Sequence, residues 1–164
     1  MEIVFRELHT AGVKFVVIGG VALLLHGVVR LTLDLDLVII PTEDNLRSFL
    51  KVMKKLGMRP RVPVDPAELL NPDTVARWRQ DKNMKAFTFI NPKEPADDIY
   101  ILIDEIIPFG EIARDAVVFD ISGIPVSVIS IPHLKRMKMI AGRPQDLADL
   151  ASLSELEKMK DDKE

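Results

Sequence analysis

The chain has 164 residues, 48% of them hydrophobic, and its 22 basic and 25 acidic residues give a formal net charge of −3. This length suits a single domain with a substantial core, and the charge excludes the overall basic surface that duplex nucleic acid usually attracts. Because cysteine is absent, disulfides, thiolate metal sites and a cysteine nucleophile are excluded as well.

The N-terminus lacks the pattern of an exported or membrane-inserted protein. Acidic residues flank the short apolar run Ile3–Phe5, whereas a signal peptide begins with basic residues. The longest uncharged apolar stretch, Phe15–Val29, has 15 residues, and a membrane-spanning helix needs ~20. We therefore expect a cytoplasmic protein without membrane contact, with one domain over residues 1–159 and a charged tail at residues 160–164.

The first third of the sequence alternates between helix and strand signals. Apolar residues at helical spacing, β-branched runs, and glycine or proline stops define the boundaries. The expected elements are a helix at Glu2–Thr10, a strand at Lys14–Ile18, a helix at Val21–His26, a strand at Leu33–Ile40 and a helix from Thr42 to Leu56.

The pattern changes at Met58–Pro72, where four prolines predict an irregular segment with one helical turn at Ala67–Leu70. The elements expected beyond it are a helix at Thr74–Gln80, strands at Lys85–Ile90 and Ile99–Ile103, a helix at Phe109–Asp115, a hairpin of Val117–Ser122 and Pro125–Ile129, and helices at Pro132–Ala141 and Pro144–Met159. This order predicts an α/β (α+β) domain in which helices pack against a twisted mixed sheet.

Two aspartates, Asp34 and Asp36, interrupt an otherwise apolar predicted strand. Side chains alternate along a strand, so both carboxylates project from the same face, roughly 6.5 Å apart along the chain. Such a pair disfavours its own ionisation unless a cation lies beside it. Hard divalent ions bind carboxylate oxygens together with substrate phosphates. The pair therefore predicts a site suited to phosphoryl-type transfer by two metals, one on the attacking oxygen and one on the leaving phosphate.

Gly19 and Gly20 lie between a predicted strand and a predicted helix, upstream of the aspartates. Glycine lets the backbone approach a ligand closely, and the N-terminus of a helix offers unpaired N–H groups to phosphate oxygens. The intervening helix returns the chain to the same edge of the sheet. Phosphate-binding turn and metal ligands are therefore expected to be neighbours.

These residues together resemble the polymerase-β-like nucleotidyltransferase superfamily. The resemblance begins at Phe15-Val16-Val17-Ile18-Gly19-Gly20 and continues through Arg30-Leu31-Thr32-Leu33-Asp34-Leu35-Asp36. A second match follows in the right order, around Met137-Lys138 and Gly142-Arg143-Pro144-Gln145-Asp146. The sequence is most similar to small prokaryotic members related to AbiEii-type toxins and to the minimal nucleotidyltransferases, which implies the nucleotidyltransferase fold.

The resemblance also implies roles for individual residues. Asp34 and Asp36 would hold Mg²⁺ or Mn²⁺. Substrate-binding roles, mostly at the triphosphate, are implied for Gly19, Gly20, Arg30, Thr32, Lys138, Arg143 and Asp146.

Three of these residues have simpler interpretations. Arg30 is equally consistent with a surface charge, and Lys138 with a lysine whose stem covers apolar surface. Asp146 is also suited to the N-terminus of the last helix.

The family pattern includes a third acid on a neighbouring strand. In this sequence Tyr100 occupies the matching position, Asp98 lies to one side, and Asp104 lies two steps to the other. We expect Asp104 to be the third catalytic acid, because a carboxylate after an apolar run is costly to bury without a partner. The alternatives are Asp98, neither acid, or Asp104 as a cap for the following helix.

The resulting hypothesis is a Mg²⁺-dependent enzyme that transfers a nucleoside monophosphate from an NTP such as ATP to a hydroxyl on RNA, protein or a small molecule. The alternative is a nucleotide-binding module with weak or absent catalysis, acting in a toxin–antitoxin pair. The second hypothesis includes a protein partner. The high apolar share also leaves room for a homo-oligomer interface.

Overall fold

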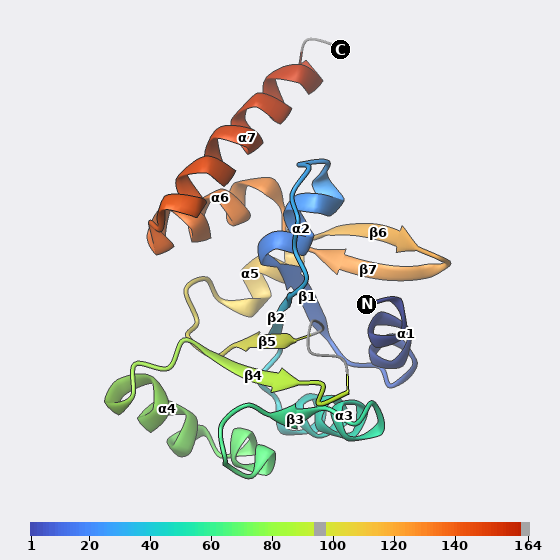
Figure 1. Ribbon diagram of the computed structural model, residues 1–164, viewed down its shortest axis with the longest axis vertical. Coiled ribbons are helices and arrows are strands. Elements are labelled where there is room, and N and C mark those ends of the chain that lie inside the picture. Colours follow the sequence, from blue (N-terminus) through green and yellow to red (C-terminus); the bar gives the residue numbers. More distant parts are fainter. Residues whose placement is uncertain (94–97, 162–164) are drawn as a thin grey trace.

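The computed structural model describes residues 1–93 and 98–161 of the chain (Figure 1). The helices are α1 (Glu2–Thr10), α2 (Gly19–His26), α3 (Glu43–Lys55), the 3₁₀ helix η1 (Pro66–Leu70), α4 (Pro72–Asp81), α5 (Phe109–Arg114), α6 (Ile131–Ala141) and α7 (Pro144–Asp161). The strands are β1 (Phe15–Ile18), β2 (Leu35–Ile39), β3 (Arg59–Pro60), β4 (Ala86–Ile90), β5 (Ile99–Leu102), β6 (Val117–Ile121) and β7 (Ile124–Val128).

The strands of the described residues form one mixed sheet of seven strands in the order β3-β4-β5-β2-β1-β7-β6. The β2–β5 and β1–β7 pairs are parallel, and the other neighbours are antiparallel. In the central rows Ile18 lies opposite Asp36, and Asp36 lies opposite Tyr100. The predicted α/β fold with a mixed sheet is therefore confirmed.

One face of the β2-β5-β4 region is packed with aromatic and aliphatic side chains. Phe49 of α3 meets Phe89 of β4 edge to face, with ring centroids 5.6 Å apart, and Trp78 of α4 stacks on Phe87 at 5.5 Å. Helices α3 and α4 thus cover this face. Leu35, Leu37 and Ile39, which alternate along β2, also line it. Since side chains alternate along a strand, Asp36, Tyr100 and Thr88 point to the opposite face and remain only partly buried.

Helices α6 and α7 pack against each other at one end of the molecule, whereas α3, η1 and α4 lie at the other end (Figure 1). Gly142 separates α6 from α7 in the left-handed conformation, with φ 61°, which glycine adopts without strain. This turn folds the start of α7 back onto α6. The β6–β7 hairpin projects sideways from the sheet and turns at Ser122 and Gly123, both with positive φ, as two-residue hairpin loops require.

Several predicted boundaries differ from the structure, and three of the differences concern the site or the Pro-rich segment. Strand β2 begins at Leu35 rather than Leu33, so Asp34 lies just before the strand. Helix α2 begins at Gly19, so both glycines belong to its first turn. The Pro-rich segment contains the short edge strand β3 as well as η1, because Arg59 and Pro60 pair with the antiparallel strand β4.

Helix α7 continues through Asp161, and residues 162–164 of the predicted tail lie outside the described residues. Over the ranges 1–93 and 98–161, the structure contains no helix with both the length and the apolar character that a membrane span requires.

Candidate active site

Asp36 faces the backbone of Gly19. A β-carbon added to Gly19 would lie 2.7 Å from the carboxyl carbon of Asp36 and still closer to its Oδ2 atom. Gly19 also has a φ of +64°, which other residues rarely adopt. Two constraints therefore require glycine at position 19: the positive φ angle and the carboxylate of Asp36 beside it. The predicted proximity of the glycine turn and the aspartate is present in the structure.

Thr32 lies in the same way against Gly20. A β-carbon on Gly20 would come within 2.6 Å of Thr32 Oγ1. The connector before β2 therefore crosses directly over the first turn of α2. Together, Asp36 and Thr32 cover the two glycines, so the helix N-terminus borders the predicted metal ligand.

The ionisation of Asp36 is strongly disfavoured. Burial is the largest cause, and with the charge of Asp34 it raises the pKa of Asp36 from 3.8 to about 6. The Gly20 backbone N–H and the charges of Arg143 and Lys138 lower the pKa in part. Among the described residues, neither aspartate forms an ion pair. The pair thus has the electrostatic character of a site that requires a cation.

A network of charged side chains, with Lys138, Asp146 and Asp149 buried at its centre, lies between α6, α7 and the connector before β2. Lys138 donates to Asp149 at 2.6 Å and contacts Asp146 at 3.4 Å. Arg30 pairs with Asp149, and Arg143 donates to Asp146 from its Nε at 2.8 Å and its backbone N–H at 3.1 Å. The structure therefore brings Arg30, Lys138, Arg143 and Asp146 together.

Two carboxylates of this network are buried, and its three cations leave a net positive charge. Burial would raise the pKa of Asp146, but hydrogen bonds from Arg143 and the charges of Arg143 and Lys138 outweigh burial and lower it. The ionised network also acts on Asp36, since Lys138 and Arg143 favour its charged form. It therefore provides positive charge on one side of the aspartates.

Tyr100 of β5 occupies the position directly beside Asp36. Burial, followed by the charge of Asp34, raises the pKa of its phenol above the ordinary value of 10.0. The guanidinium of Arg61 lies 5.9 Å from the centre of the Tyr100 ring and pairs with Asp98. Tyr100 thus provides a neutral phenol at the position where the resemblance to the nucleotidyltransferases implies an acid.

Asp98 lies level with the start of β2, because its carbonyl accepts from the Leu35 N–H at 3.0 Å. Asp104 lies two residues beyond the end of β5. Its carboxylate accepts from Lys85 at 2.7 Å, so the partner of Asp104 is a surface lysine.

Asp34 and Asp36 provide the donor chemistry of a hard divalent cation. Two carboxylates without cationic partners suit Mg²⁺, which takes one or two protein carboxylates and completes its shell with phosphate oxygens and water. Within residues 1–93 and 98–161, no three acidic or histidine side chains gather as a metal cluster. The described residues therefore fit one metal ion that arrives with a triphosphate, and they gather no third carboxylate for the second ion expected from the sequence.

Two contacts of this region were not predicted from the sequence. Asp149 lies near Asp146 at the start of the last helix, and its pairing with Arg30 joins positions 119 residues apart. The only sequence feature that indicates a role for Asp149 is its position one helical turn after Asp146. Arg61 follows an edge strand in the Pro-rich segment, and no local pattern predicts that it lies over Tyr100.

Comparison with known proteins identifies the family of the chain. Residues 2–163 match the family described as nucleotidyl transferase AbiEii toxin, type IV TA system. The chain belongs to this family. Among curated proteins, none matched the sequence.

Solved structures of nucleotidyltransferases share the fold of this AbiEii-family chain. A candidate nucleotidyltransferase from Thermotoga maritima aligns with a TM-score of 0.58 and 13% identity, covering 92% of this chain and 87% of the other. An antigenic nucleotidyltransferase-like protein from Paracoccidioides brasiliensis has a TM-score of 0.54 and 18% identity, with 92% and 72% covered. ANT(2″)-Ia, in complex with adenylyl-2″-tobramycin, has values of 0.56 and 15%, with 92% and 83% covered. At these identities the likeness shows the fold alone.

Proposed function

We propose that this AbiEii-family chain transfers a nucleoside monophosphate from an NTP to a hydroxyl acceptor in the presence of Mg²⁺ or Mn²⁺. The observation that carries the proposal is the contact between Asp36 and the Gly19 backbone. It places a carboxylate with a pKa raised to about 6 at a helix N-terminus, where phosphate oxygens are favoured. Family membership and the shared fold support the same reaction class.

In this proposal one group of residues binds the metal ion, and a second group binds the triphosphate. Asp34 and Asp36 ligate the divalent ion, and the first N–H groups of α2 at Gly19 and Gly20 donate to phosphate oxygens. Arg30, Lys138 and Arg143 contribute positive charge beside the aspartates, while Asp146 and Asp149 fix their positions. Thr32 shapes the rim over Gly20.

The reaction requires an acceptor hydroxyl in line with the leaving pyrophosphate. Its oxygen forms a bond to the α-phosphorus, the bond from that phosphorus to the bridging oxygen breaks, and pyrophosphate leaves with the electron pair. The hydroxyl proton passes to water. A bound divalent ion supplies charge stabilisation for the phosphates. Fixed cations and N–H groups stabilise developing charge without reorganisation.

Tyr100 supports a second candidate function. A phenol whose pKa is raised does not take up a proton at neutral pH, so position 100 provides no base for the acceptor hydroxyl. The chain would then bind nucleotide without efficient transfer and act through a protein partner, as a member of a type IV toxin–antitoxin family. Asp98, the other acid considered for this role, forms an ion pair with Arg61.

One experiment distinguishes the enzyme hypothesis from the binding-module hypothesis. The chain is incubated with each α-³²P-labelled NTP, Mg²⁺, and either total RNA, cell protein or an aminoglycoside, and covalent label in the acceptor is measured. The enzyme hypothesis predicts Mg²⁺-dependent label that is lost in Asp36→Asn and retained in Asp104→Asn. Saturable nucleotide binding with no label in any acceptor favours the binding module.

A further inference from the structure

A groove of about 770 Å³ lies between α3, η1 and β4. Its floor includes Phe89, which projects from β4 to the face covered by α3. Thr88, the preceding residue, pairs with Tyr100 and points to the opposite face. The groove is therefore separated from the Asp34 and Asp36 site by the thickness of the sheet.

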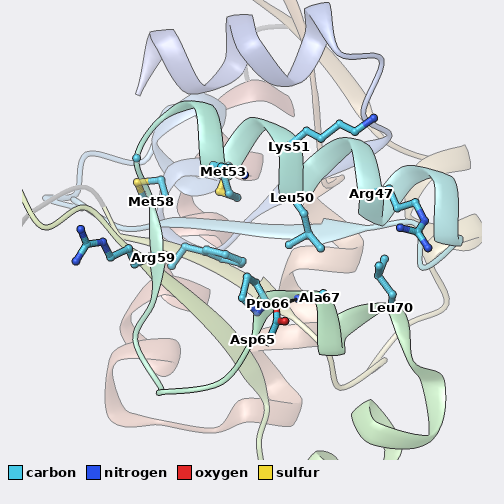
Figure 2. A pocket seen from close by; sticks show the side chains of 13 residues that line it. Arg47, Leu50, Lys51, Met53, Met58, Arg59, Asp65, Pro66, Ala67 and Leu70 are labelled. Carbon is cyan, nitrogen blue, oxygen red and sulfur yellow. Dashed lines mark hydrogen bonds between the residues drawn. The ribbon is translucent and has the colours of Figure 1, made fainter.

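The floor of the groove is apolar. Figure 2 shows Leu50 projecting from α3 toward η1, on which Pro66 and Leu70 lie. Leu50, Pro66 and Leu70 remain partly exposed, so the groove can accept further apolar side chains. Methionine adapts its shape to different partners, and Met53 and Met58 both line the groove.

The rim of the groove is basic. Arg47, Lys51, Lys54 and Arg59 line it, and Figure 2 shows Arg47 and Arg59 extending from its edges. In the part of the chain that the structure describes, Lys51, Lys54 and Arg59 form no ion pair. Arg47 pairs only with the exposed Glu43, at 2.6 Å.

One acid, Asp65, also lines the groove, but its side chain accepts from the Ala67 N–H at 2.8 Å and caps η1. Asp65 keeps its negative charge, so four basic residues and one acid leave the lining with a net positive charge. An apolar floor beside a net basic rim favours an occupant that is both apolar and anionic.

The apolar lining favours protein over nucleic acid as that occupant. Single-stranded nucleic acids bind through bases stacked on exposed aromatic faces. Phe89, the aromatic residue of the groove, is 1% exposed and packs against Phe49, so it offers no stacking surface. Aliphatic and methionine side chains instead suit the apolar face of a helix laid into a groove.

We propose that this groove binds an acidic amphipathic segment of a protein partner. The apolar side chains of the segment would contact the partly exposed Leu50, Pro66 and Leu70, and its Asp and Glu residues would pair with Lys51, Lys54 and Arg59. The proposal concerns the face away from the aspartates and does not depend on nucleotide transfer.

The test uses a fluorescein-labelled helical peptide of about 18 residues, with leucine along one face and glutamate on both flanks. Fluorescence anisotropy measures its binding to the full chain. The comparison probes are a scrambled peptide of the same composition, a version with glutamine for glutamate, and a single-stranded RNA of about 12 nucleotides.

The groove variant combines Lys51→Glu, Lys54→Glu and Arg59→Glu. The control variant combines Lys82→Glu, Lys93→Glu and Lys158→Glu, which changes the net charge equally at exposed positions outside the groove. Circular dichroism and thermal unfolding verify that both variants fold. A variant with Leu50→Ser alone probes the floor without changing charge.

We expect the amphipathic peptide to bind the wild type and the control variant equally, and the groove variant at least about tenfold more weakly. Leu50→Ser should weaken binding as well, and the scrambled and glutamine peptides should bind poorly. The proposal is overturned if the amphipathic peptide does not saturate, if the groove variant binds it unchanged, or if the RNA competes for the groove with higher affinity. If the groove variant does not fold, Leu50→Ser decides the result.

Discussion

The carboxylate of Asp36 occupies the space that a side chain on Gly19 would need. This relationship joins the first turn of α2 to strand β2, which are 17 residues apart in sequence. It also means that the backbone N–H groups of the turn and the carboxylate share one small volume. The proposed nucleotide site depends on this contact.

Gly19→Ala is expected to disrupt the site through both strain and collision. The positive φ of Gly19 costs an alanine about 1 kcal/mol, and contact with Asp36 adds to that cost. Gly12→Ala is the matched control, because Gly12 has a φ of +68° but no neighbour within 4 Å. Urea unfolding should show a larger loss for Gly19→Ala than for Gly12→Ala. Equal losses would mean that Asp36 moves away freely.

Asp36→Asn is expected to stabilise the metal-free chain at pH 7. The folded pKa of about 6 exceeds the ordinary value of 3.8, so the folded state binds the proton more tightly. The stability due to this proton is fully present below about pH 4 and is lost as the pH rises through 6. The variant should therefore gain about 1–3 kcal/mol at pH 7 and almost nothing at pH 4.

Urea unfolding in EDTA at pH 4, 5 and 7 measures this effect. Asp104→Asn serves as the control, because its carboxylate forms a surface ion pair with Lys85 and its loss should change stability by less than about 1 kcal/mol. A loss of stability in Asp36→Asn at pH 7 would show that the carboxylate is not electrostatically disfavoured.

Lys138→Met is expected to destabilise the fold by about 2–4 kcal/mol. Methionine preserves the volume of the stem, but the buried carboxylates of Asp146 and Asp149 lose a shared cation, and uncompensated buried charge is costly. Lys85→Met removes the exposed pair with Asp104 and should cost less than about 1 kcal/mol. Similar unfolding midpoints for the two variants would show that the buried network is dispensable.

Tyr100→Asp is expected to strengthen the response to Mg²⁺. The substitution places a third carboxylate beside Asp36, which should lower stability without metal, because like charges repel, and raise the stabilisation that Mg²⁺ provides. Tyr100→Phe keeps the ring beneath Arg61 and should leave the Mg²⁺ response unchanged. Thermal unfolding across a Mg²⁺ titration measures both. An equal response in the two variants would show that position 100 does not face the metal.

The glycines and aspartates were predictable from sequence because their arrangement is local. A strand, a glycine turn, a helix and a return strand place Gly19 near Asp36 whatever the rest of the fold. The mixed sheet also followed from the order of strand and helix signals. The prediction placed Asp34 inside the strand. The strand instead begins at Leu35, the residue after Asp34, because pairing with β5 starts there.

The remaining contacts depend on pairings that the local sequence does not determine. Arg61 reaches Tyr100 only because β3 adds to the edge of β4. Arg30 meets Asp149 only because α7 folds back on α6. The expectation for Asp104 rested on the cost of burying it unpaired, and Lys85 removes that cost. Such contacts require knowledge of which strands become neighbours.

The most direct test of the proposed site is a thermal-unfolding screen of the four NTPs, each with and without Mg²⁺, on the wild type and Asp36→Asn. If Asp36 and the Gly19 turn share a metal-bound triphosphate, ligand at 100 times its Kd should stabilise the wild type by about 2.7 kcal/mol. The shift should require both Mg²⁺ and a triphosphate and should disappear in Asp36→Asn. An equal shift in that variant, or no shift in the wild type at millimolar nucleotide, would contradict the account.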